Sequence, residues 1–223
     1  DHHLTYGGHV AVLWLVAIAR SLFGGAGRSR TQHLVMSATT LVLLGLGLYW
    51  SYARSPQLGA LAGLGVLVLL LPGRRRAVAI ALVVLAIAVA LTEPTTRERY
   101  AKLFDTSTES TRLLLWESSL DAIASRPATG FGPGNFHEMM AVHEVEGEYN
   151  TRAHAHNDYI MHAVNGGVPM LGFALLLAGG LVVVLVRGLR VGGDRAGPAR
   201  LDWIIAAALA AHVALMAAGL VQV

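Results

Sequence analysis

The sequence predicts an all-α, polytopic integral membrane protein with about six transmembrane helices and one large, partly helical outer loop. Hydrophobic residues make up 54% of the 223-residue chain and charged residues only 14%, whereas soluble proteins carry roughly 25% charged residues. Apolar stretches recur along the chain, and basic residues gather in alternate connections between them. A soluble protein with buried core helices is the alternative, but several stretches lack any charged residue over fifteen or more positions.

Several of the apolar stretches are near or slightly below the ~17 to 25 residues that cross a bilayer as a helix. We therefore expect four transmembrane helices in residues 1–92, an outer loop in 93–158 and two transmembrane helices in 159–223. Because the sequence starts without a signal-peptide pattern and stops within an apolar run, we expect an internal part of a longer protein. The apolar stretches are 8–23, 34–50, 58–72, 77–92, about 159–186 and 201–223.

The charges of the connections predict the topology. Arginines concentrate in residues 24–33, 73–76 and 187–200, which the positive-inside rule places in the cytoplasm. The connections 51–57 and 93–158 are then outside. The long one holds eleven acidic residues against six basic ones, a net charge of −5.

The outer loop is expected to carry one amphipathic helix. Ser and Thr side chains at 107–111 are typical of a helix N-terminus, with Arg112 in the first turn. Arg126-Pro127 should end the helix, because proline disfavours the helical conformation in the residue before it. The apolar face recurs at helical spacing and consists of Leu113, Trp116, Leu120 and Ile123.

Two further segments of the loop hold candidate site residues. The run GFGPGNF (130–136) offers backbone amides for a phosphate, but it lacks the context of a dinucleotide motif, so we interpret it as a tight, shaped turn. The segment HAHND (154–158) places histidines, the side chains best suited to act as a base near neutral pH, at a membrane boundary. Zinc binding by this pair with His137 or His143 is an alternative, although the spacings match no usual set.

Arg54 and Arg112 are candidate anion ligands. Arg54 lies in a short outer connection, where a purely topogenic arginine would be on the wrong side of the membrane. Its guanidinium suits the phosphate of a lipid-linked substrate, whereas the alternative is an interfacial anchor that reaches the headgroups. Arg112 could face a cleft, or it could be a solvated residue that pairs with Glu109 or Glu117.

Three segments, taken in order around one outer loop, resemble the O-antigen ligase family. They are SYARSPQLGA (51–60), RLLLWESSLDAI followed by PATGFGPGNF (112–136), and HAHNDYIMHAVNGG (154–167). That family also includes O-antigen-type polymerases and protein O-oligosaccharyltransferases. The chain departs from the family pattern at Asn165, where an acid is frequent, and at Met170, where a second small residue is common.

The resemblance implies roles for individual residues. Arg54 matches the arginine of the family's first motif, Arg112 that of its R-x-x-x-W motif, and His156 the histidine of its H-N-x9-G motif. These three would be catalytic. The residues expected to bind substrate are Trp116, His154, Asn157, Gly132, Gly134 and Gly167.

The activity implied is an inverting, metal-independent glycosyl transfer in the bacterial inner membrane, with the catalytic loop in the periplasm. The donor would be an undecaprenyl-pyrophosphate-linked glycan, and the acceptor a hydroxyl of a glycolipid, glycan or protein. Arg54 and Arg112 would stabilise the leaving pyrophosphate, while His156 would accept the acceptor's proton. No cofactor and no nucleic-acid partner are expected.

Two other function classes stay open at this point. A transporter or flippase would place paired ionisable residues within the spans, where the sequence has few. A non-catalytic assembly subunit would use the outer loop as a docking surface. Replacement of Arg54, Arg112 or His156 would then leave glycan transfer intact.

Overall fold

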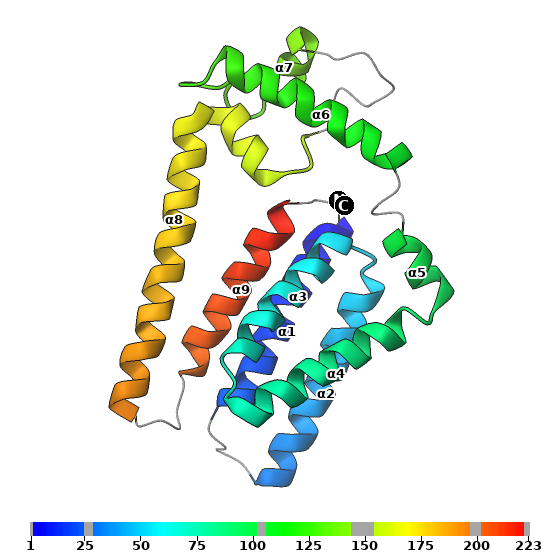
Figure 1. Cartoon of the computed structure of the whole chain (residues 1–223), viewed down its shortest axis with the longest axis vertical. Coiled ribbons are helices and arrows are strands. Elements are labelled where there is room, and N and C mark those ends of the chain that lie inside the picture. Colours follow the sequence, from blue (N-terminus) through cyan, green and yellow to red (C-terminus); the bar gives the residue numbers. More distant parts are fainter. Residues whose placement is uncertain (1, 25–28, 102–105, 144–153, 197–201, 221–223) are drawn as a thin grey trace. The chain divides into compact units, whose positions relative to one another are not determined.

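The computed structural model describes residues 2–24, 29–101, 106–143, 154–196 and 202–220, where all regular secondary structure is helical (Figure 1). The predicted all-α class is confirmed. The acidic stretch 144–152 and both ends of the last predicted span lie partly or wholly outside the described residues. The helices are α1 (His2–Phe23), α2 (Arg30–Trp50), α3 (Arg54–Leu69), α4 (Gly73–Ala90), α5 (Pro94–Ala101), α6 (Thr106–Ser125), α7 (Phe136–His143), α8 (Asp158–Ala196) and α9 (Trp203–Leu220).

Within these described ranges, four helices are long and apolar enough to cross a membrane, fewer than the six expected. The apolar helix α3 has only 16 residues. The 18-residue α4 begins with a glycine and three arginines, so its uncharged part is too short. The chain is nevertheless a polytopic helical membrane protein. The four segments are Leu4–Phe23, Thr31–Trp50, Asp158–Val191 and Trp203–Leu220.

The chain forms two compact units. Unit 1 comprises residues 1–71 and 176–223, and unit 2 comprises residues 72–175. The boundary falls within α8, whose first half belongs to unit 2. The motif segments of the outer loop are therefore all in unit 2, whereas Arg54 is in unit 1.

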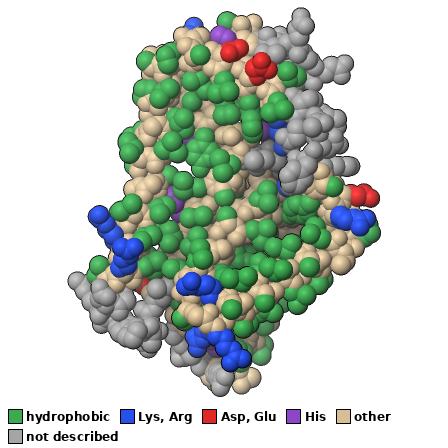
Figure 2. All heavy atoms as spheres, in the orientation of Figure 1, with side chains coloured by type: hydrophobic (Ala, Val, Ile, Leu, Met, Phe, Trp, Pro, Cys, Tyr) green, Lys and Arg blue, Asp and Glu red, His purple; other side chains and the backbone are tan. Residues whose placement is uncertain are grey.

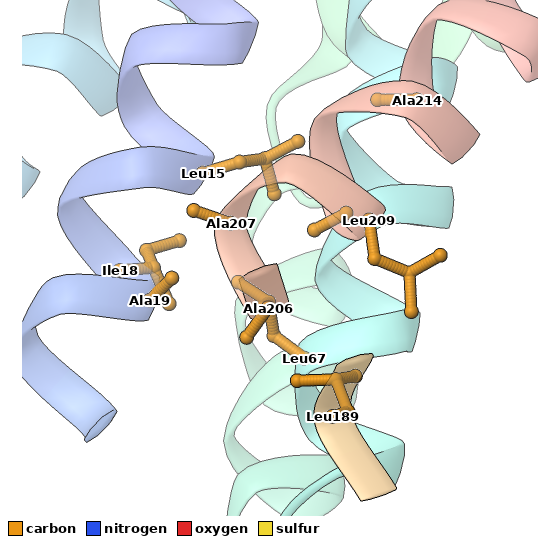
Figure 3. Close-up of a cluster of buried hydrophobic side chains, with 10 residues drawn as sticks. Leu15, Ile18, Ala19, Leu67, Leu189, Ala206, Ala207, Leu209 and Ala214 are labelled. Atoms are coloured by element: carbon orange, nitrogen blue, oxygen red, sulfur yellow. The ribbon is translucent and has the colours of Figure 1, made fainter. Parts of the chain in front are cut away.

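In unit 1, α3 and α9 pack closely because both present small residues. A Cβ at Gly59 would lie 2.4 Å from the carbonyl oxygen of Ala214, and one at Gly63 would lie 2.5 Å from that of Ala210. Small residues four apart let transmembrane helices approach and gain van der Waals contact. Leu15 of α1 joins α3 and α9 in the buried cluster of this unit (Figure 3).

The outer surfaces of the helices are strongly apolar. Leu82 and Val84 on α4 are each 60% exposed, and Leu176 on α8 is 76% exposed. Figure 2 shows hydrophobic side chains spread over a large part of one face, interspersed with backbone and other atoms. Exposed apolar surface on this scale is unfavourable in water, and lipid acyl chains would cover it in a membrane.

Candidate functional site

Trp116 links α6 to the histidine segment that precedes α8. Its indole Nε1 donates a 2.7 Å hydrogen bond to the carbonyl oxygen of Ala155, 39 residues further along the chain. Ala155 is fully buried and stands between His154 and His156. The R-x-x-x-W and H-N segments, which the sequence presents separately, are thus brought together in unit 2.

A backbone turn places His154 and His156 side by side. The backbone N–H of His156 donates to Nδ1 of His154 at 3.1 Å, and the two ring centroids are 4.2 Å apart. Because Nδ1 of His154 accepts this bond, the neutral ring carries its proton on Nε2. His156 has a φ of +52°, in the left-handed region that few non-glycine residues adopt. The turn therefore fixes the backbone conformation of His156, the residue expected to act as the base.

Asn157 begins α8. Its Oδ1 accepts hydrogen bonds from the backbone N–H groups of Tyr159 at 2.9 Å and Ile160 at 3.1 Å. An asparagine in this position satisfies amides that have no partner in the first helical turn. The resemblance assigns the side chain of Asn157 to substrate binding. In the structure this side chain also has a structural role, because it caps the helix that begins directly after it.

The first half of α8 is interrupted where Gly166 and Gly167 leave helical geometry. Pro169 has no backbone N–H, so the carbonyl of Asn165 lacks its usual donor four residues later. The backbone N–H of Gly132 supplies this hydrogen bond at 2.9 Å. The break in α8 is thus compensated by the glycine-rich turn of the outer loop.

Two more backbone hydrogen bonds complete this junction between the turn and α8. The N–H of Phe131 donates to the carbonyl of Val164 at 2.7 Å, and the N–H of Val168 donates to that of Pro127 at 2.8 Å. The segment 130–136 is therefore the specifically shaped turn that the sequence predicted. The hydrogen bonds of this turn stabilise the interrupted part of α8.

Glycine is required at both sides of the junction. A Cβ at Gly130 would lie 2.4 Å from the carbonyl oxygen of Val164, and a Cβ at Gly167 would lie 2.4 Å from that of Pro127. Gly130 and Gly167 also have positive φ angles of +61° and +71°. Packing alone explains Gly167, so its predicted contact with substrate stays a prediction, as do those of Gly132 and Gly134.

Only part of the predicted apolar face of α6 packs against the buried cluster of unit 2. Leu113 and Leu120 are 56% and 59% exposed, whereas Leu115 and Ala122 are buried together with residues of α7 and α8. The predicted end of the helix before Pro127 is confirmed, since α6 ends at Ser125. Trp116 and Ile123 of the predicted face pack against this cluster, whereas the other two residues of that face do not.

A family model described as O-antigen ligase matches residues 39–177, more than half of the chain. The chain belongs to the O-antigen ligase family. A comparison with curated proteins gave no match. The predicted family is confirmed, and the chain is accordingly part of a membrane enzyme of the O-antigen ligase and polymerase type.

Within this O-antigen ligase domain, Arg112 is half-buried on α6, one helical turn before Trp116. Residues four apart on a helix lie on the same side, so Arg112 is on the side of α6 that carries the tryptophan bonded to the histidine segment. In the other unit, Arg54 is the first residue of α3 and is also half-buried. Its predicted role and that of Arg112 stay predictions.

Some groups that shape the ligase domain could not be predicted from the sequence. The carbonyl of Ala155 is one, because backbone groups are the same in every residue. At Asn165, where the chain departs from the family pattern, the side-chain Oδ1 is buried and has no hydrogen-bond partner among the described residues. Among those residues, no three His, Asp or Glu side chains could together hold a metal ion, so the zinc alternative gains no support there.

Proposed function

We propose that this chain catalyses transfer of a glycan from an undecaprenyl-pyrophosphate carrier to an acceptor hydroxyl on the periplasmic side of the bacterial inner membrane. Membership of the O-antigen ligase family supports the reaction class. The observation that supports the choice of residues is the hydrogen bond between Trp116 and Ala155. It holds the helix of Arg112 against the turn that carries His156.

In the proposed reaction the acceptor oxygen attacks the anomeric carbon from the side opposite the pyrophosphate. The bond between that carbon and the pyrophosphate oxygen breaks, and its electron pair stays on the leaving oxygen. His156 accepts the proton of the hydroxyl, and the carrier leaves as undecaprenyl pyrophosphate. The pyrophosphate linkage itself provides the driving force, and the configuration at the anomeric carbon inverts.

Arg112 is proposed to stabilise the charge that develops on the leaving pyrophosphate. A cationic group that acts mainly on the transition state contributes about 100- to 1,000-fold to the rate. A positioned base such as His156 contributes about 100- to 10,000-fold. Loss of either side chain should therefore reduce transfer strongly.

Arg54 is proposed as a second phosphate ligand, on separate grounds. It begins α3, and the first turn of that helix contains no acidic residue. The positive end of a helix dipole and a guanidinium both favour a bound anion. An arginine used only as a lipid anchor would tolerate replacement by lysine, whereas a bidentate phosphate ligand would not.

The experiment is glycan transfer by the full-length protein in proteoliposomes that contain a polyprenyl-pyrophosphate-linked glycan. Arg112→Ala and His156→Ala should lower the initial rate at least 100-fold while the protein still inserts. His137→Ala, at an exposed position of α7, is the matched control and should retain the wild-type rate. Normal transfer by either site variant would remove that residue from the mechanism.

Two further experiments test the need for a metal ion and identify the acceptor. EDTA should leave the rate unchanged, since His156 and the arginines need no metal. Deletion of the gene would identify the acceptor: free polymer should accumulate if the protein is a ligase, and single repeat units if it is a polymerase. Loss of glycan from proteins would indicate a protein O-oligosaccharyltransferase.

A further inference from the structure

A cavity of about 380 Å³ lies between α1 and α2, both of which belong to unit 1. It is distinct from the histidine segment, which belongs to unit 2. Its apolar lining comes from Ala17 and Met36. Its polar lining consists of one guanidinium, one imidazole and three hydroxyls, those of Arg20, His33, Ser21, Ser37 and Thr40.

The charged residues of the cavity lie at one end of the helical hairpin. Arg20 is in the last turn of α1, and His33 is in the first turn of α2. Met36 and Thr40 follow one and two turns further along α2, towards the middle of the span. The cationic side chains therefore lie at one end of the cavity, and uncharged side chains, both apolar and hydroxyl-bearing, line its deeper part.

Trp203, the first residue of α9, contacts the guanidinium of Arg20 at the cationic end of the cavity. The Cζ of Arg20 lies 5.6 Å from the centre of the Trp203 ring, within the range of a cation–π contact. Tryptophan is enriched where membrane meets water, at the depth of the headgroups. An arginine that stacks on a ring keeps N–H groups in its plane with which to bind oxygens.

The side of the membrane follows from the charges of the sequence. The connection between α1 and α2 contains Arg28 and Arg30, so the positive-inside rule predicts that this end of the hairpin faces the cytoplasm. The cytoplasmic leaflet is rich in anionic lipid, and basic pockets between transmembrane helices bind such headgroups. Small anions have no acyl chain, so they would leave the apolar lining residues Ala17 and Met36 uncovered.

We propose that this cavity binds the phosphate headgroup of an anionic phospholipid of the cytoplasmic leaflet. Arg20 and His33 bind the phosphate oxygens, and Ser37 and Thr40 bind the glycerol or ester oxygens below. An acyl chain contacts the apolar lining residues Ala17 and Met36 beside them. Ser21 contributes less as a donor, because its hydroxyl already donates to the carbonyl of Ala17 at 2.7 Å.

The experiment measures lipid retention by the full-length protein with native mass spectrometry after titration with phosphatidylglycerol or phosphatidylethanolamine. The wild type should retain one phosphatidylglycerol with at least tenfold higher affinity than phosphatidylethanolamine. Arg20→Gln should remove this preference. Arg75→Gln, which removes an exposed arginine of α4 outside the cavity, is the matched control and should keep it.

Two more variants separate a built site from attraction to a basic surface. Ser37→Leu fills the cavity without changing any charge, and Thr40→Val removes a hydroxyl at nearly constant volume. Both should weaken phosphatidylglycerol binding at least threefold if the proposal is right. Wild-type affinity in both variants would overturn it, as would equal retention of the two lipids by the wild type.

An inorganic phosphate arm tests the identity of the ligand. Phosphate at millimolar concentration should displace little lipid, because it lacks acyl chains. Complete displacement would show a site for free phosphate and would overturn the lipid assignment. Since this cavity is separate from His156 and Arg112, failure here leaves the proposed glycan transfer untouched.

Discussion

The indole N–H of Trp116 is hydrogen-bonded to the carbonyl oxygen of Ala155, and this bond joins two motifs of the O-antigen ligase family. The partner is a backbone atom, so the position of His156 depends on the tryptophan without any contact between the two side chains being required. A change at Trp116 should therefore act through the placement of the histidine turn.

Trp116→Phe keeps an aromatic ring and removes only the N–H donor. Because Ala155 is fully buried, its carbonyl would be left without this partner, at a cost of about 1–3 kcal/mol of stability. Thermal unfolding in detergent should show the loss, and glycan transfer should fall while donor binding persists. Wild-type stability together with wild-type transfer would show that the bond does not position the site.

Gly167→Ala should disrupt the junction between α8 and the glycine-rich turn. The new Cβ would meet the carbonyl oxygen of Pro127 at 2.4 Å, and the φ of +71° is itself unfavourable for alanine. We expect a loss of roughly 2–4 kcal/mol from overpacking and backbone strain. Gly172→Ala on the same helix, where the Cβ would meet nothing within 4 Å, is the matched control. Equal melting temperatures of the two variants would contradict the junction.

Glu93 should make the start of α5 sensitive to acid. Hydrogen bonds with the side chain of Thr96, then that of Thr95, and with their backbone N–H groups lower the pKa of Glu93 from 4.5 to about 2. A lowered pKa means that the stabilisation is complete above pH 4.5 and is lost as the pH falls from 4.5 towards 2. Below that window, the protonated side chain can no longer cap α5 as effectively.

Hydrogen exchange at the amides of Thr95 and Thr96, corrected for the intrinsic rate, measures this effect. Protection should be lower at about pH 3 than at about pH 6 in the wild type, following the linkage above. Glu93→Gln should lower protection at the higher pH and flatten the difference. Glu98→Gln, which removes another carboxylate of α5, should behave like the wild type. A pH dependence that survives Glu93→Gln would assign it to another group.

The sequence was sufficient for the features that depend on local chemistry. The class of membrane helices, the end of α6 before Pro127 and the turn at 130–136 were all predicted from composition, proline and glycine. The family was predicted from the order of its motifs and is confirmed. These signals are carried by side chains or by their absence, so they are visible in the printed residues.

The features that depend on distant backbone groups could not be predicted. Nothing in the sequence pairs Trp116 with Ala155, or Gly132 with the carbonyl of Asn165, because carbonyls carry no residue-specific signal. Leu113 and Leu120 share the predicted apolar face with Trp116 and Ile123, but they are exposed, and only the other two pack against the buried cluster. In a membrane protein the apolar side of a helix can face lipid as readily as core, so periodicity does not decide between them.

The most direct test of the account is the side of the membrane on which α7 lies. A single cysteine is introduced into the 223-residue chain, which contains none, and every cysteine elsewhere in the full-length protein is replaced by serine. A membrane-impermeant maleimide added to intact spheroplasts should label Glu138→Cys, and should label Arg75→Cys only after permeabilisation. Labelling of Arg75→Cys in intact cells, with Glu138→Cys protected, would contradict the periplasmic site and the cytoplasmic lipid cavity together.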